Sequence, residues 1–279
     1  MVRQWALAGC IALGLGMPVR ADGPQRVVSM NLCTDQLAMM LAAPGQLVSI
    51  SFVSREPESS AMAREAEGYP VNHGQAEEIV RLKPDLVLAG SYSDQATVEM
   101  LRRFQIPVET FAPENDFDGI RKSIRKMGEV LGREAEAGAM IADFDRDLAS
   151  LQDGPTDRPR AALYYPNGYT SGSDTLVGHI IDAAGFRNIA TEAGLTEGGV
   201  LALEKLVLAN PDQIIQGQRY SATSRSEEIL DHPAVRELSK RAGGAAMADP
   251  DWVCGTPYVL NAIAKLRDAR KALQGEGRS

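Results

Sequence analysis

The 279-residue chain is poor in aromatic residues, histidine and cysteine, and basic residues are not in excess. Aromatic residues make up 5% of the sequence, and only three histidines and three cysteines occur. The 29 Lys and Arg residues are outnumbered by 37 Asp and Glu, which gives a formal net charge of -8. This balance argues against a nucleic-acid-binding protein, which would carry basic patches, and no basic amphipathic run suggests a lipid-surface protein.

Long apolar runs are absent after the first 21 residues, so no membrane-spanning segment is expected there. Residues 1–21 combine Arg3, an apolar stretch from Trp5 to Met17 and a small-residue site ending at Ala21, which predicts a cleavable signal peptide and a periplasmic protein. The stretch is shorter than the roughly 20 residues that span a bilayer, which disfavours a retained anchor. A lipid anchor at Cys10, which lies in a sequence resembling a lipoprotein processing box, is the weaker alternative.

Sequence motifs of common enzymes are also missing. The chain has no GxGxxG after its first predicted strand, no phosphate-binding GxxxxGK[ST] loop, no GxSxG elbow and no HExxH. Cys33 and Asp35 could be read as a catalytic pair, but no histidine stands at a recognisable spacing from them. The sequence therefore predicts a protein that is not an enzyme.

Loss of the signal peptide would leave two cysteines, Cys33 and Cys254. Neither CxxC nor CxxxH spacing surrounds them, so a structural zinc site has little support. Three interpretations stay open: a disulfide, which an oxidising compartment permits, two unconnected residues, or a pair of thiolate ligands.

What the chain does contain is an alternation of apolar and amphipathic segments. RVVSMN, TDQLAMMLAA, QLVSIS and AEEIVRLKPDLVLAG follow one another from residue 26, and the alternation starts again after residue 159. Strand–helix alternation is typical of α/β units with a mostly parallel sheet. The sequence thus predicts the α/β class with two Rossmann-like lobes.

The second half repeats the first. AEEIVRLKPDLVLAG can be laid over ALEKLVLANPDQIIQG at an offset of 127, the difference between Pro211 and Pro84. Glu77 then falls on Glu204, and Gly90 on Gly217. A looser match places Thr34 over Thr175. Two matches in the same order indicate two similar lobes.

Residues 116–152 between the halves contain no proline and have apolar residues at three-and-four spacing, as in an amphipathic helix. If continuous, this helix would be about 50 Å long. The alternative is two helices with an irregular break near Gly132. A long connecting helix would allow only small motion between the lobes, and the broken alternative leaves the two-lobed interpretation intact.

The chain resembles the helix-linked, two-lobed substrate-binding proteins of ABC importers that carry vitamin B12, ferric siderophores and haem. The resemblance rests on RVVSMNLCTDQL, AEEIVRLKPDLVLAG, the linking helix, LEKLVLANPDQII and DWVCGTPYVLNAI. It implies a signal peptide over 1–21, an N-terminal lobe over 22–113, one long linking helix over 114–153 and a C-terminal lobe over 154–279, with a ligand cleft between the lobes. It also implies docking on a permease, with its ATPase, through one acidic residue of each lobe, here Glu77 and Glu204. Both could equally be ordinary surface carboxylates near a helix start.

Ligands of open α/β sheets collect beyond the carboxyl ends of the strands, so the loops there supply the candidate contacts. The tyrosines and the tryptophan of these loops suit a large planar or apolar chelate. Arg55 and Arg219 could grip carboxylates, and His73 could ligate a metal, although Asn72 beside it is expected to cap a helix. The candidate ligand-binding residues are Met30, Asn31, Cys33, Thr34, Arg55, His73, Tyr92, Tyr165, Asn167, Tyr169, Arg219, Tyr220 and Trp252.

These observations predict a monomeric periplasmic receptor that binds a ferric siderophore or cobalamin and passes it to an importer. No intrinsic cofactor is expected beyond the bound ferric chelate or corrinoid. The alternatives are a haem-binding member of the same family, a two-lobed periplasmic sensor and, less well supported, an α/β enzyme.

Overall fold

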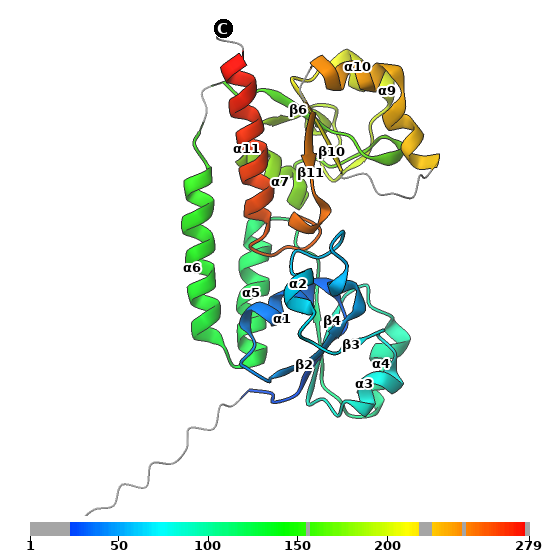
Figure 1. Cartoon of the computed structure of the whole chain (residues 1–279), viewed down its shortest axis with the longest axis vertical. Coiled ribbons are helices and arrows are strands. Elements are labelled where there is room, and N and C mark those ends of the chain that lie inside the picture. Colours follow the sequence, from blue (N-terminus) through cyan, green and yellow to red (C-terminus); the bar gives the residue numbers. More distant parts are fainter. Residues whose placement is uncertain (1–22, 155–156, 218–224, 242–243, 277–279) are drawn as a thin grey trace, which may run out of the picture.

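The computed structural model describes residues 23–154, 157–217, 225–241 and 244–276. The predicted signal peptide and Cys10 lie outside the described residues. Within them the chain forms two α/β lobes, connected along one side by helices. In Figure 1 the N-terminal lobe lies below the C-terminal lobe, and they are called the lower and the upper lobe. This arrangement confirms the predicted fold class.

The N-terminal lobe is built on a parallel sheet with the strand order β3-β2-β1-β4-β5. Every residue of β1 and β4 is buried, as expected for strands covered by helices on both faces. The strands are β1 Val27–Ser29, β2 Leu47–Ser51, β3 Val71–Asn72, β4 Leu86–Gly90 and β5 Val108–Phe111.

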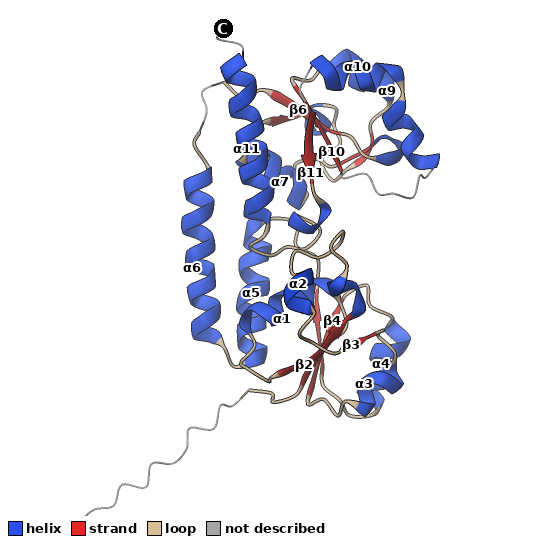
Figure 2. Ribbon diagram, viewed as in Figure 1, coloured by secondary structure: helices blue, strands red, loops and turns tan. Residues whose placement is uncertain are grey.

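Helices flank this sheet in Figure 2, and side-chain caps fix where two of them begin. The Asn31 side chain accepts hydrogen bonds from the backbone N–H groups of Cys33 and Thr34, and Asp94 does the same for Ala96 and Thr97. Each cap is worth about 1 kcal/mol. The helical segments are α1 Leu32–Leu41, η1 Phe52–Arg55, α2 Ala63–Ala66, α3 Ala76–Arg81 and α4 Gln95–Arg103.

The predicted single helix over 116–152 is wrong, and the alternative of a break near Gly132 is confirmed. Helix α5 (Phe117–Leu131) ends at Gly132, whose φ of 67° and ψ of 39° are left-handed, and α6 (Glu134–Leu151) follows. Glycine adopts this conformation without steric cost. The helices then lie side by side, and a Cβ on Gly128 would come within 2.4 Å of the Ala137 side chain. Of these two helices, α6 is the one that runs from the lower lobe to the upper one (Figure 1).

The C-terminal lobe has a second parallel sheet, ordered β11-β10-β6-β8, and a small antiparallel ribbon of β7 and β9. Its strands are β6 Arg160–Leu163, β7 Tyr169–Thr170, β8 Arg187–Asn188, β9 Gly199–Val200, β10 Gln213–Gly217 and β11 Gly244–Met247. Its helical segments are η2 Pro166–Gly168, α7 Leu176–Ala183, α8 Ile189–Glu192, α9 Leu203–Ala209, η3 Arg225–Asp231, α10 Pro233–Arg241, η4 Asp249–Asp251 and α11 Val259–Glu276.

The internal repeat is confirmed. Strands β4 and β10 correspond residue for residue at the offset of 127, since 86 plus 127 is 213 and 90 plus 127 is 217. Helices α3 and α9 start at the same offset, and the order β2-β1-β4-β5 is matched by β8-β6-β10-β11. The looser match is shifted, because Thr175 caps α7 whereas Thr34 lies inside α1.

One apolar cluster connects the two lobes along the helical side of the molecule. It includes Leu88 of the lower sheet, Phe144 of α6, Ile263 of α11 and Ile215 of the upper sheet, all buried. The lobes are therefore joined by packed helices rather than by a free linker. Among the described residues no helix is both long and apolar enough to cross a membrane.

Candidate ligand cleft

A pocket of about 790 Å³ lies between the lobes, at the carboxyl ends of both sheets. In the lower sheet, β1 and β4 are neighbours whose connections leave in opposite directions, and such a switch point is where α/β sheets bind ligands. The segments after these strands supply Asn31, Cys33, Ser91 and Tyr92 to the pocket. The pocket is therefore placed by the topology of the sheets.

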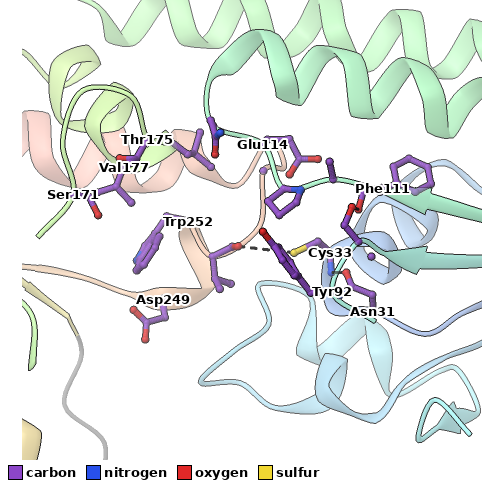
Figure 3. Close-up of a pocket in the computed structure, with 18 of the residues that line it drawn as sticks. Asn31, Cys33, Tyr92, Phe111, Glu114, Ser171, Thr175, Val177, Asp249 and Trp252 are labelled. Atoms are coloured by element: carbon purple, nitrogen blue, oxygen red, sulfur yellow. Dashed lines mark hydrogen bonds between the residues drawn. The ribbon is translucent and has the colours of Figure 1, made fainter. Parts of the chain in front are cut away.

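Both lobes contribute aromatic rings. Tyr92 and Phe111 belong to the lower lobe, and Tyr165, Tyr169 and Trp252 to the upper lobe. Figure 3 shows Trp252 and Tyr92 on opposite sides of the cavity. Tyr92 is 89% exposed, so a ligand in the cleft could cover much of its surface.

The polar groups of the pocket include carboxylates. Glu114 follows β5, and its side chain accepts a hydrogen bond from the Ser123 hydroxyl and lies directly against Gly255. Burial raises the pKa of Glu114 in spite of the Ser123 hydrogen bond. Asp249, which comes after β11, is the second acidic residue of the lining.

Basic side chains are missing from the described lining: none of its residues is Lys, Arg or His. The same described part of the chain contains no group of three or more His, Cys, Asp or Glu that could hold a metal ion. The pocket thus offers aromatic faces and hydrogen-bonding groups in an acidic setting.

The structure brings together most of the residues predicted from the sequence. Asn31, Cys33, Thr34, Tyr92, Tyr165, Tyr169 and Trp252 line the pocket. Met30, Arg55, His73 and Asn167 are not among its lining residues, and Arg219 and Tyr220 lie outside the described residues.

The residues outside the lining have local roles. The Arg55 guanidinium donates hydrogen bonds to the carbonyl oxygens of Ala66, the last residue of α2, and of Tyr69 in the segment that follows. His73 stacks on Phe52 and hydrogen-bonds to Glu78. Met30 is buried in the core of the lower lobe.

The sequence predicted that Asn72 caps a helix, but in the structure Asn72 does not cap α3. The cap position is Gln75, and the Asn72 amide instead donates to the backbone carbonyls of Ser29 and Ile50 inside the sheet. Asn72 therefore ties three neighbouring strands together.

Sequence reasoning missed several parts of the lining, including Asp249, Val253 and Gly255 on either side of Trp252. Of two larger parts, the first is the loop from Phe111 to Asn115, which follows β5, and the second comprises Ser171 and the start of α7 at Thr175 to Val177. The rule that strand-end loops face the cleft would have included the first, because FAPEN directly follows the apolar strand. No signal in the sequence pointed to the second.

Cys33 and Cys254 form a disulfide, with Cα atoms 5.1 Å apart. Because Cys33 starts α1 and Cys254 precedes α11, the bond joins the two lobes. The interpretations as thiolate ligands or unconnected residues are wrong. Cys33 is also no free nucleophile, and Asp35 is buried against Ser51 and Ser54 outside the pocket lining.

Glu77 and Glu204 lie in equivalent places on the two lobes. Each is exposed in the first turn of its helix, α3 or α9. The exposed Val207 and Leu208 follow Glu204 on α9.

Two α/β lobes with an aromatic cleft at their strand ends define a two-lobed ligand-binding protein. The chain belongs to the periplasmic binding protein family, whose family model matches residues 27–240.

Among its relatives, a cobalamin-binding protein of Halobacterium salinarum is 31% identical over 234 residues, covering 81% of this chain. The aligned region spans 63% of that relative's length. Solved structures share the fold: a periplasmic haem-binding protein from Roseiflexus sp. RS-1 has a TM-score of 0.69 and 22% identity over 88% of this chain and 99% of its own. The periplasmic vitamin B12-binding protein of Vibrio cholerae has a TM-score of 0.65 and 17% identity over 90% and 98%. These matched proteins are binding proteins, not enzymes.

Proposed function

We propose that this chain is the exported receptor of an ABC importer and that its cleft binds a corrinoid of the vitamin B12 type. The observation that carries the proposal is the lining itself, which combines aromatic rings from both lobes with Glu114 and Asp249 and, among the described residues, no basic side chain.

The candidate ligands differ in the charge of the groups that they would place against this lining. A corrin is a large ring system whose edge carries neutral amides, which donate to carboxylates and pair with side chains such as Asn31 and Asn115. Haem carries propionates, and many ferric siderophores are anionic. Anionic groups would meet acidic side chains in a cleft of lowered dielectric, where repulsion is stronger than in water.

The relatives support the same choice, since the Halobacterium protein is named for cobalamin binding. The resemblance to haem-binding structures supports the fold alone, at 22% identity.

Delivery would use Glu77 and Glu204. Two exposed carboxylates at equivalent places on two related lobes could accept charge-assisted hydrogen bonds from arginines of a dimeric permease. Residues 1–21 would direct export and be removed, and the receptor would act as a monomer.

The test is a titration of Trp252 fluorescence. The protein carries Trp5→Phe, so that Trp252 is the only tryptophan whether or not residues 1–21 are removed. Dicyanocobinamide, cyanocobalamin, haemin and a ferric hydroxamate are added separately, with absorbance corrected and calorimetry as an independent readout. Saturable binding of a corrinoid with Kd below about 1 µM is expected. Tight binding of haemin or the hydroxamate without corrinoid binding would overturn the proposal.

A further inference from the structure

The segment Trp252–Thr256 of the upper lobe is fastened to the lower lobe at three consecutive residues. Cys254 is bonded to Cys33, Gly255 lies directly against the Glu114 side chain, and the Thr256 hydroxyl lies 3.5 Å from the Gln36 side-chain oxygen. We call the Cys33–Cys254 disulfide and the Glu114–Gly255 contact the clasp.

The contacts of the clasp are close and sheltered from solvent. Cys254, Gly255 and Thr256 are all buried. A Cβ on Gly255 would come within 2.4 Å of a Glu114 carboxylate oxygen, so only glycine lets the loop approach so near. The Glu114–Gly255 contact also joins equivalent loops, because Glu114 follows β5 and Gly255 follows β11, and these strands hold matching places in the two sheets.

The same segment forms a wall of the pocket. Trp252, Val253 and Gly255 line it from the upper lobe, and both lower-lobe partners in the clasp, Cys33 and Glu114, line it too (Figure 3). The position of the Trp252 ring therefore depends on a loop that is tethered across the cleft.

We propose that the clasp positions Trp252 for ligand binding, so that the oxidised protein is the binding-competent form. The inference rests on the proposed function for its ligand. Its physical basis is preorganisation: a loop already held in its bound position loses less conformational freedom when the ligand binds. Without the disulfide, Trp252–Thr256 loses its covalent link to the lower lobe, and we expect the segment to occupy more conformations.

Cys254→Ser is the central variant, because Cys254 itself does not line the pocket. Cys33→Ser/Cys254→Ser accompanies it, to remove the thiol left on Cys33. All variants carry Trp5→Phe, and folding is checked by circular dichroism below the unfolding transition. Binding of dicyanocobinamide is measured without reductant, because thiols react with cobalt corrinoids. We expect both variants to bind at least about tenfold more weakly, and acrylamide to quench Trp252 more strongly in the ligand-free state.

Glu114→Ala tests the clasp with the disulfide intact, and Glu129→Ala, an exposed carboxylate on α5, is its matched control. We expect Glu114→Ala to lose affinity by less than the serine variants do and to show increased acrylamide quenching of Trp252. Glu129→Ala should change neither. If the serine variants fail to fold, Glu114→Ala decides, together with quenching of the wild-type protein after reduction by dithiothreitol. That dithiol supplies two electrons and two protons, so the S–S bond becomes two thiols while the reagent closes to its own disulfide.

Unchanged affinity and unchanged quenching in Cys254→Ser and Glu114→Ala would overturn the inference. Failure of the proposed function looks different, because wild-type protein would then bind no corrinoid, while quenching of Trp252 would still report whether the clasp positions the ring.

Discussion

The ring of Trp252 lies 5.8 Å from the ring of Tyr165, at an interplanar angle of 48°. Tyr165 in turn lies directly over Gly217, where a Cβ would come within 2.3 Å of the tyrosine ring. The end of β10 therefore has room for the tyrosine only because it carries glycine. The two rings together form one wall of the pocket.

Replacement of Tyr165 should weaken ligand binding without unfolding the protein. Tyr165→Ala removes half of the ring pair, and we expect dicyanocobinamide affinity to fall by about 1–2 kcal/mol, roughly five- to thirtyfold. Phe104→Ala is the control, since Phe104, directly after α4, is 59% exposed and does not line the pocket. Calorimetry measures both. Equal affinities for the two variants would contradict a role for the ring pair.

A positive charge added to the rim should change which ligands bind. Asn115 lines the pocket and is exposed, so Asn115→Lys introduces a cation without disturbing the clasp. We expect haemin and the hexacarboxylate or heptacarboxylate forms of the corrin to gain affinity relative to dicyanocobinamide, more so at low ionic strength.

The control for this change is Ala139→Lys, which adds the same charge on the exposed face of α6. A similar gain in both variants would mean that net charge, and not the charge inside the pocket, governs selectivity.

The buried Asp35 should make stability depend on pH. One carboxylate oxygen accepts hydrogen bonds from the Ser51 backbone, the Ser51 hydroxyl and the Ser54 hydroxyl, yet burial raises the pKa of Asp35 from 3.8 to about 6. Since the folded-state pKa is the higher one, the contribution of Asp35 is fully present below pH 3.8 and is lost as the pH rises through about 6. The shift corresponds to about 3 kcal/mol.

Asp35→Asn should therefore flatten the pH dependence of the unfolding free energy between about pH 4 and 6. Urea unfolding of the wild-type protein and the variant across that range gives the comparison, with Glu129→Gln as an exposed control. If the two slopes agree, Asp35 has the same pKa in the folded and unfolded chains.

Replacement of Glu77 and Glu204 should impair transport without changing ligand binding. Glu77→Ala and Glu204→Ala lie outside the pocket lining, so dicyanocobinamide affinity should stay at the wild-type value while uptake in cells with the cognate permease falls. Glu99→Ala on α4 and Glu237→Ala on α10 are the controls. Unchanged uptake in Glu77→Ala/Glu204→Ala would show that the permease does not use this pair.

The features that could be predicted from the sequence are those that repeat. The offset of 127 predicted corresponding strands and helices because a buried parallel strand demands an apolar run and the Pro-Asp turn before it breaks the helix. The sequence did not decide between one helix and a break at Gly132. The amphipathic pattern continues through the break because both helices bury an apolar face.

Contacts between distant segments escaped prediction. The guanidinium of Arg55 is occupied by carbonyls near Tyr69, and nothing in the local sequence shows that α2 ends there. Asn72 turns into the sheet because β3 lies beside β2. The sequence left the pairing of Cys33 and Cys254 open, because only the packing of α1 against the loop before α11 brings them together.

The separation of 221 residues between Cys33 and Cys254 also bears on how the molecule is made. Cys33 emerges early in synthesis, and its partner comes only when nearly the whole chain has appeared. The bond therefore needs nearly the whole chain to be present. In the finished protein it closes a loop that contains most of both lobes, so it restricts the unfolded chain and favours the form in which the two halves are packed together.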